Sequence, residues 1–196
     1  LAHDRPGLLP APGDDGALAG QAGPRAFDAD MAPLATAPRQ LEAEFVFPYL
    51  AHAAMEPLNC TVRLTGNKAE LWAGSQCPGL DAGAAARVLG IQPEQVTMNV
   101  QMAGGGFGRR FSSTSDFMVE ACEIAKAART AGLNVSVRTV WSREDDMRGG
   151  YYRPMHLHRA RIGFDDSGNV LAWDHVIVGQ SVTTGTVFGE FQVKNG

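Results

Sequence analysis

The chain has 196 residues, of which 44% are hydrophobic and 19% are charged, and this composition is typical of a globular protein with one good core. A formal net charge of -4 argues against a nucleic-acid-binding surface, which needs a broad basic footprint. No apolar run approaches the roughly 20 residues that span a bilayer, and no basic start leads into an apolar signal core, so we expect a soluble chain. Cys60, Cys77 and Cys122 are odd in number and too widely spaced for a disulfide framework or a zinc knuckle.

The first 40 residues differ in character from the rest. Residues 1–40 are dominated by Ala, Gly and Pro without strand alternation or a helical stripe, so we predict a linker or surface arm there. From Arg39 to Phe47 the residue types alternate, and Pro48 closes the run, which predicts a strand. We therefore expect residues 41–196 to form the folded part, as a single domain.

The next elements are a hairpin and a helix. Cys60–Leu64 and Ala69–Ala73 alternate on either side of a turn that contains Gly66, a pattern typical of a β-hairpin. Apolar residues then recur on one side of a stretch that Asp81 is placed to cap and Gly90 to end. This stretch predicts a helix packed on the hairpin.

Two polar features flank this hairpin. His52 and Glu56 are four residues apart and would share one face of a helical turn; this spacing favours a local polar pair, since a zinc-binding helix would need a second His. Gln76 follows the second hairpin strand, and polar groups that face ligands often lie at such strand ends. The alternative for Gln76 is an amide that caps a turn.

A glycine-rich loop joins the most strand-like run to the best helix. Val96–Met102 alternates strictly and leads into Gly104-Gly105-Gly106-Phe107-Gly108-Arg109-Arg110. An apolar stripe from Phe117 to Ala128 follows, opened by a capping box of Ser113 and Asp116. Glycines let a ligand approach the backbone, and the two arginines carry forked donors suited to phosphate.

Strand, glycine loop and helix also make up nucleotide-binding loops, so those motifs must be tested. A dinucleotide fingerprint needs a third glycine, but Arg109 stands at its position. A P-loop needs Gly-Lys followed by Ser or Thr, and no such run exists. Both nucleotide interpretations fail.

A strand and a charged corner come next. Asn134–Trp141 alternates as a strand does, and it ends in Ser142-Arg143-Glu144-Asp145-Asp146-Met147. Adjacent carboxylates are compatible with hard-metal binding, but the alternating ligands and central glycine of a calcium loop are missing. We expect a solvated turn or an ion-paired corner.

The last clear pattern in the sequence predicts a second hairpin. Met155–Phe164 and Asn169–Val178 flank a turn around Gly168. His156 and His158 share one face of their strand, and an exposed polar face is favoured over a zinc pair because no third ligand is suggested. Together the elements predict an α+β fold: a mixed β-sheet of about six or seven strands with two main helices packed on it and an N-terminal coil arm.

Five segments in fixed order resemble one family. They are His52-Ala53-Ala54-Met55-Glu56-Pro57-Leu58-Asn59-Cys60, Ser75-Gln76-Cys77-Pro78-Gly79, the glycine run with its two arginines, Trp141-Ser142-Arg143-Glu144-Asp145-Asp146-Met147, and Tyr152-Arg153-Pro154. This set is similar to the molybdenum hydroxylases related to xanthine dehydrogenase and aldehyde oxidase. The glycine run most resembles the molybdopterin-binding large subunit of isoquinoline 1-oxidoreductase and of membrane-bound aldehyde dehydrogenases.

The resemblance implies a molybdenum-dependent enzyme that hydroxylates aldehydes or N-heteroaromatic rings, takes oxygen from water and passes electrons to an iron–sulfur partner. It implies a molybdenum–molybdopterin cofactor in the cytosine dinucleotide form, an iron–sulfur small subunit, a cytochrome c-type acceptor and a periplasmic, membrane-associated assembly. The cofactor would carry the chemistry while the protein supplies orientation and electrostatics. The alternative is a non-catalytic scaffold or partner-binding domain that retains this fold.

The resemblance also assigns site residues. Gln76 matches the glutamine whose amide sits beside a molybdenum oxo ligand, and an amide donates a hydrogen bond without adding charge. Phe107 matches the loop phenylalanine whose backbone lies at the metal, and Gly105, Gly106 and Gly108 permit that approach. We therefore expect molybdenum near Gln76 and Phe107, with no ligand supplied directly by a side chain.

The neighbouring residues limit this assignment. By chemistry alone, Arg109 and Arg110 are candidate partners of the pterin's phosphate or of a neighbouring segment. Phe111 stands where xanthine dehydrogenases have a glutamate that helps bind purines, which disfavours purine hydroxylation. The family's general base is a glutamate far toward the C-terminus of a much longer subunit, and Glu56 belongs to a different motif. We thus expect a fragment that alone is inactive and does not retain the cofactor.

Overall fold

The computed structural model describes residues 31–182, which divide into two compact units. Leu50–Arg153 form one, the loop unit; the described part of the other, the strand unit, comprises residues 31–49 and 154–182. The α+β class and seven strands are confirmed for the described chain, but the strands form two sheets, one in each unit, rather than the single sheet predicted. Of the predicted arm, residues 1–40, the first 30 residues lie outside the described residues.

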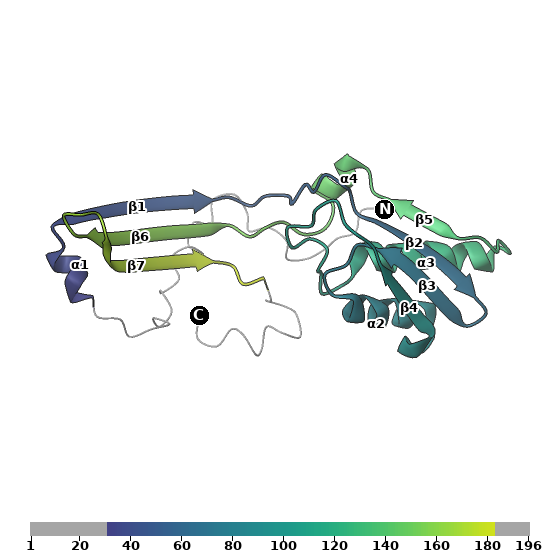
Figure 1. The fold of residues 1–196 in the computed structure, drawn as a ribbon. Coiled ribbons are helices and arrows are strands. Elements are labelled where there is room, and N and C mark those ends of the chain that lie inside the picture. The colour runs from purple at the N-terminus through teal and green to yellow at the C-terminus, as the bar shows by residue number, and fades with distance from the viewer. Residues whose placement is uncertain (1–30, 183–196) are drawn as a thin grey trace. The chain divides into compact units, whose positions relative to one another are not determined.

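The strand unit is built on a three-stranded antiparallel sheet. Its strands are β1 (Arg39–Phe47), β6 (His156–Phe164) and β7 (Val170–Gly179), in the order β1-β6-β7 (Figure 1). The predicted bounds of β1 are confirmed, and so is the second hairpin, formed by β6 and β7. A short helix, α1 (Ala32–Thr36), stands where the sequence predicted coil, because its residue Leu34 buries its side chain.

The two faces of this sheet differ in chemistry. One face carries the ion pairs Arg159–Glu44 and Arg161–Asp174, with N···O distances of 2.9 and 2.6 Å. Residues two apart point to the same face, so the opposite face carries His156, His158 and their apolar neighbours. That face leaves large apolar side chains exposed: Leu41, Phe45, Phe47, Trp173 and Ile177.

The loop unit contains a four-stranded mixed sheet in the order β4-β3-β2-β5. Its strands are β2 (Asn59–Thr65), β3 (Lys68–Ala73), β4 (Val96–Val100) and β5 (Val137–Val140). β2 pairs antiparallel with β3 and with β5, whereas β3 and β4 are parallel. The parallel pair requires a crossover, and a helix between the two strands provides it.

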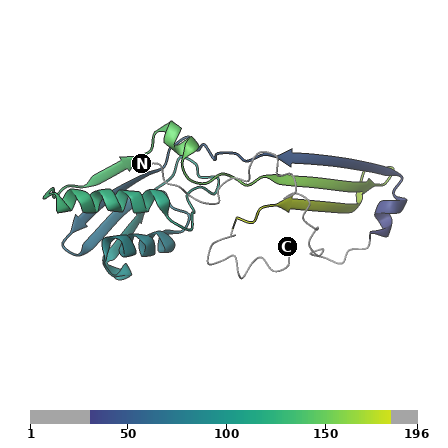
Figure 2. The ribbon, with the colours of Figure 1, turned by 180° about the vertical axis from the view of Figure 1, so that it is seen from behind.

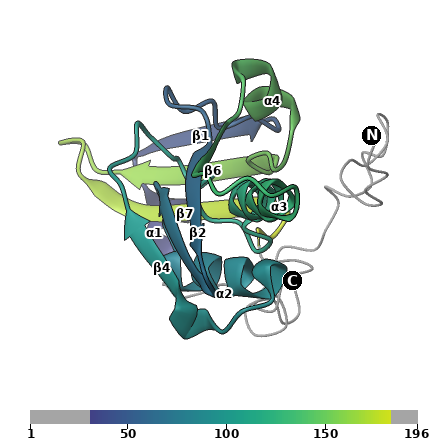
Figure 3. The same cartoon turned by 90° about the vertical axis from the view of Figure 1, so that its right-hand side faces the viewer.

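Two helices pack on the sheet of the loop unit. They are α2 (Pro78–Leu89), which makes the crossover, and α3 (Asp116–Thr130), and Figure 2 shows both in front of the strands. Figure 3 looks almost along the axis of α3. Between helices and sheet lies one apolar core: Leu58, Cys60, Val62, Ala69, Leu71, Ala73, Ala85, Phe117, Met118, Ala121, Cys122 and Ala125. At about 25 cal/mol per Å² of buried apolar surface, this core is the main source of the unit's stability.

The predicted caps of both helices are wrong, for one physical reason. Asp81 does not cap α2, which begins three residues earlier; its carboxylate is buried and accepts a hydrogen bond from Ser75. Ser113 and Asp116 form no capping box, because the Asp116 carboxylate binds Arg109 instead. Each carboxylate takes a side-chain partner from the segment that precedes its helix, Ser75 or Arg109, rather than backbone N–H groups of its own helix.

The described chain is completed by two short helices. These are η2 (Pro93–Gln95), a single 3₁₀ turn before β4, and α4 (Arg143–Arg148) after β5. α4 begins with a capping box of Ser142 and Asp145, so the charged corner has a regular start. Within residues 31–182, no helix has both the length and the apolar character needed to cross a membrane.

Candidate functional site

The glycine-rich loop, residues 101–115, connects β4 to α3 in the loop unit. Gly105 and Gly108 have φ of 99° and 98°, a region that other residues rarely adopt. Phe107, between them, has φ of 51° and a side chain that is 76% exposed. Four consecutive backbone N–H groups, those of residues 105–108, have no hydrogen-bond acceptor among the described residues. The loop therefore has a row of free donors, meaning four N–H groups that are consecutive in sequence and have no acceptor among the described residues.

Gln76 lies beside this loop. Its side-chain oxygen accepts a hydrogen bond from the backbone N–H of Arg110 at 3.1 Å, and its own backbone N–H donates to the Arg110 carbonyl at 3.1 Å. A Cβ added at Gly106 would lie 3.3 Å from that side-chain oxygen. The backbone N–H of Arg110 thus fixes the oxygen end of the Gln76 amide toward the loop. The amide NH₂ of Gln76 has no acceptor among the described residues and is a free donor.

A buried acid supports the segment that carries Gln76. Asp81, 4% exposed, accepts a 2.5 Å hydrogen bond from the Ser75 hydroxyl, whose oxygen in turn accepts the backbone N–H of Cys77 at 3.1 Å. Burial raises the pKa of the Asp81 carboxyl. The residues on both sides of Gln76 are therefore held by one hydroxyl group.

Arg110 anchors the loop from within. Its side chain is 2% exposed; Nε donates to the carbonyl of Gly105 at 2.8 Å, and Nη2 donates to the carbonyl of Glu56 at 3.2 Å. Of the two partners predicted for Arg110, a neighbouring segment is the one that the structure provides. Its remaining nitrogen, Nη1, is buried without an acceptor in the described chain.

Arg109 is also buried and faces the start of α3. Two of its nitrogens bind the Asp116 carboxylate at 3.1 and 2.7 Å, and its guanidinium carbon lies 5.5 and 5.6 Å from the ring centroids of Trp141 and Tyr151. Here too the neighbouring segment supplies the partner. The Nε of Arg109 is buried without an acceptor among the described residues.

His52 and Glu56 do not form the predicted local pair. The Glu56 carboxylate accepts the Gly104 N–H at 2.5 Å and the Asn59 amide at 2.6 Å. These two hydrogen bonds lower the pKa of Glu56. His52 lies beside Gly108, and burial, followed by the charge of Arg109, lowers the pKa of its imidazole. The sequence did not predict that Glu56 binds the backbone of the glycine loop, although both segments are among the five that resemble one family.

The charged corner after β5 also contacts the segment of Glu56. Arg143 binds Asp146 at 2.7 Å, so the predicted ion-paired corner is confirmed. The same guanidinium donates to the carbonyls of Ala54 and Met55, at 2.5 and 3.0 Å. α4 therefore also supports residues 54 and 55, which directly precede Glu56.

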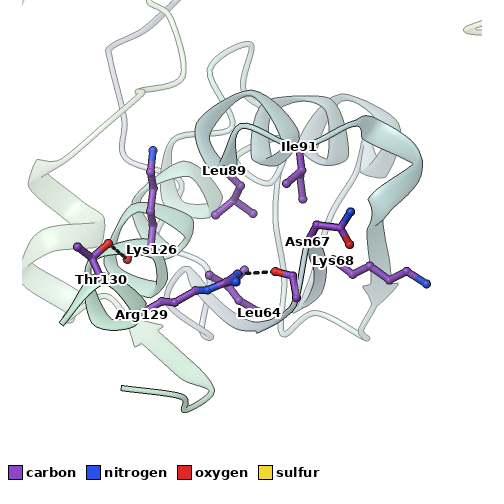
Figure 4. Close-up of a pocket in the computed structure, with 9 residues that line it drawn as sticks. Leu64, Asn67, Lys68, Leu89, Ile91, Lys126, Arg129 and Thr130 are labelled. Atoms are coloured by element: carbon purple, nitrogen blue, oxygen red, sulfur yellow. Dashed lines mark hydrogen bonds between the residues drawn. The ribbon is translucent and has the colours of Figure 1, made fainter. Parts of the chain in front are cut away.

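A hollow of about 350 Å³ lies elsewhere in the loop unit, at the ends of α2 and α3 (Figure 4). Leu89 and Ile91 point into it, and Lys126 and Arg129 stand at its edge. Both cations are engaged: Lys126 donates to the Val88 carbonyl at 2.9 Å, and Arg129 donates to a turn carbonyl at 2.6 Å. Since α3 has 15 residues, this hollow and the glycine loop lie at opposite ends of a helix about 22 Å long.

The histidines of the strand unit make a pair that the sequence did not suggest. His158 Nδ1 and His175 Nε2 are 3.1 Å apart, and the rings of His156 and His158 have centroids 5.9 Å apart. Partial burial, then His175 and His156, lower the pKa of His158. Among residues 31–182 no group of three His, Cys, Asp or Glu side chains is arranged to hold a metal.

Comparison with known proteins adds a family to this geometry. A family model described as molybdopterin cofactor-binding domain matches residues 22–191. The chain is 31% identical over 144 residues to isoquinoline 1-oxidoreductase subunit beta of Brevundimonas diminuta, and the match covers 72% of this chain and 17% of that protein. It is 30% identical over 136 residues to the aldehyde oxidoreductase molybdenum-binding subunit PaoC of Escherichia coli K12, covering 69% and 18%.

Solved structures show the same fold. Quinoline 2-oxidoreductase from Pseudomonas putida 86 superposes with a TM-score of 0.56 at 20% identity, over 74% of this chain and 18% of that one. Aldehyde oxidoreductase from Desulfovibrio gigas superposes with a TM-score of 0.53 at 20% identity, over 75% and 16%. The chain thus spans about a sixth of the length of each of these four proteins.

Proposed function

The chain belongs to the molybdopterin cofactor-binding domain family, and from this premise we propose that it is part of the molybdenum-cofactor subunit of an oxidoreductase. The proposed reaction is hydroxylation of an aldehyde or an N-heteroaromatic ring with water as the oxygen source. Relatives whose names specify an isoquinoline oxidoreductase and an aldehyde oxidoreductase support this substrate range. Phe111, 43% exposed, offers no carboxylate for a purine.

The donor set of the loop unit is the observation that carries this proposal. The free NH₂ of Gln76 and the four free N–H groups of residues 105–108 belong to neighbouring segments, which Arg110 joins. Neutral donors in a row are suited to oxygen atoms that carry partial or full negative charge. The oxo and phosphate oxygens of a molybdenum–pterin group have this character, so the residues present fit the cofactor.

Each residue then has a proposed role toward the cofactor. Gln76 donates to an oxygen on the metal side, and Gly105, Gly106 and Gly108 let the backbone approach. Phe107 contributes its backbone N–H and an exposed ring next to the reacting centre. Arg109 shapes the end of the loop through Asp116, and its Nε, the guanidinium nitrogen without an acceptor among the described residues, is the donor that we assign to the pterin's phosphate. When bound, the cofactor supplies the oxygen transfer and takes up the electrons.

The remaining partners are part of the same proposal. We propose the cytosine dinucleotide form of the cofactor, an iron–sulfur small subunit as first electron acceptor and a cytochrome c-type acceptor beyond it. The rest of the subunit would complete the cofactor site. We also propose a periplasmic, membrane-associated assembly, and one relative that is named a membrane-bound aldehyde dehydrogenase supports the membrane association.

Replacing Gln76 in the complete subunit tests the proposal against the scaffold alternative. Gln76→Ala removes the free amide donor, and we expect turnover to fall roughly 10- to 100-fold, with fold and partner binding unchanged. Gln40→Ala, on an exposed strand position of the other unit, is the matched control and should leave turnover unchanged. Unaltered turnover in Gln76→Ala would instead support a non-catalytic scaffold.

A further inference from the structure

Glu56 and Gly104 are joined by two reciprocal hydrogen bonds. The Glu56 carboxylate accepts the Gly104 N–H at 2.5 Å, and the Glu56 N–H donates to the Gly104 carbonyl at 3.2 Å. The other carboxylate oxygen accepts the Asn59 amide at 2.6 Å, which fixes the rotation of the carboxylate. The residue that precedes the row of free N–H groups is therefore held on both its donor and its acceptor.

Arg110 extends this contact to Gln76. Its Nη2 lies 3.4 Å from the Glu56 carboxylate, and within the described chain Glu56 is the carboxylate with which Arg110 forms an ion pair. The backbone of Arg110 makes both hydrogen bonds to Gln76. Glu56, Arg110 and Gln76 thus form a continuous series of contacts across three segments that are far apart in sequence.

We propose that Glu56 is a positioning residue that, through Arg110, sets the direction of the Gln76 amide and keeps the loop donors in a row. The inference rests on the function proposed above for its meaning in catalysis, but its structural part concerns this chain alone. Without the carboxylate, the 2% exposed guanidinium of Arg110 would retain only carbonyl partners. A buried charge without its counter-ion is unfavourable, so Arg110 would shift and its backbone contacts with Gln76 would loosen.

Crowding at Gly104 gives a second way to disturb the same contact. A Cβ added at Gly104 would lie 2.6 Å from the Cβ of Glu56, closer than real Cβ atoms approach one another. Gly104→Ala must therefore displace Glu56 while leaving its charge in place. If Glu56 acts by position, the two substitutions should have the same consequence.

The first test uses the 196-residue chain without cofactor. In Glu56→Gln and in Gly104→Ala we expect amide hydrogen exchange at residue 104 to accelerate at least about tenfold, and the NMR signals of the Gln76 side-chain NH₂ to shift. Glu123→Gln, an exposed glutamate on α3, is the matched control and should change neither. Unchanged Gln76 signals in both variants, with unchanged melting temperature, would overturn the inference whatever the function of the site.

The second test uses the complete subunit and a double-mutant cycle. If Glu56 acts through Gln76, Glu56→Gln should lower kcat roughly tenfold in the native background and have no further effect in Gln76→Ala. Additive effects would overturn the coupling between the two residues. A Gln76→Ala variant that loses no turnover would instead contradict the proposed function, while the NMR result would still decide the structural part.

Discussion

The two units of the described chain differ in how completely they bury their apolar side chains. In the loop unit, two helices close one face of a four-stranded sheet, and side chains such as Leu71 and Phe117 are fully removed from solvent. In the strand unit, three strands and one short helix bury Leu34, Ala160 and Ile162, while Phe45 and Trp173 are more than half exposed.

The site residues belong to the unit with the packed core. Gln76 follows β3, Glu56 precedes β2 and the glycine loop follows β4, so three strands of one sheet fix the starting points of the three segments. A constellation held by rigid elements keeps its geometry better than one held by loops alone. Core packing in the loop unit is therefore a precondition for holding the free N–H groups of residues 105–108 in place.

Cysteine reactivity should show the largest contrast, between the core and the surface of the loop unit, which contains all three cysteines. Burial raises the pKa of Cys60 and of Cys122 to about 12, from 9.0, so in the folded state both stay protonated until the pH rises far above 9. A rise of about three units in the pKa of a thiol reduces its thiolate fraction near pH 8 roughly 1000-fold. We expect a thiol reagent to modify the half-buried Cys77 alone in the native chain and all three cysteines in urea. Rapid native labelling of Cys122, read by mass spectrometry, would contradict a closed core.

Truncating a ring in each unit should give the next largest difference. Phe117→Ala, at 2% exposure, should lower the free energy of unfolding by about 3–5 kcal/mol through lost transfer energy and a cavity. Phe45→Ala, at 55% exposure, should cost less than about 1.5 kcal/mol, because most of the ring already contacts solvent. Urea unfolding measures both. Equal losses would mean that the strand unit buries this face in solution.

Breaking one ion pair in each unit should show the same difference in stability. Asp116→Asn leaves Arg109, whose side chain is 4% exposed, without its carboxylate, and should cost about 3 kcal/mol. Glu44→Gln breaks a pair whose side chains are 63% and 50% exposed, and solvent screening limits the cost to about 0.2–1 kcal/mol. Added salt should reduce the smaller effect further. A larger loss for Glu44→Gln, measured by thermal unfolding, would reverse our ranking of the units.

Local patterns predicted the elements well. Alternation and Pro48 placed β1 at Arg39–Phe47, and Gly90 ends α2 in the left-handed conformation expected of a C-terminal cap. Both strand hairpins follow from alternation around a turn. What local pattern does not specify is the partner: Arg39 pairs with Phe164, 125 residues away, so one sheet or two could not be decided from the sequence.

The same limit applies to the candidate site. Resemblance brought Gln76 and the glycine run together, and the structure joins them through Arg110. That Arg110 and Arg109 are buried and engaged depends on Glu56 and Asp116, whose approach is a result of tertiary packing. The roles predicted for Phe107 and Arg109 toward the cofactor stay predictions.

Molybdenum content tests the central claim most directly. The complete subunit and this 196-residue chain would be purified in parallel and analysed for the metal. We predict about one molybdenum per complete subunit and far less on the chain alone, because on this account the chain supplies only part of the cofactor's binding site. A complete subunit without molybdenum would contradict the proposed function, and about one equivalent held stably by the chain alone would contradict its role as part of a larger site.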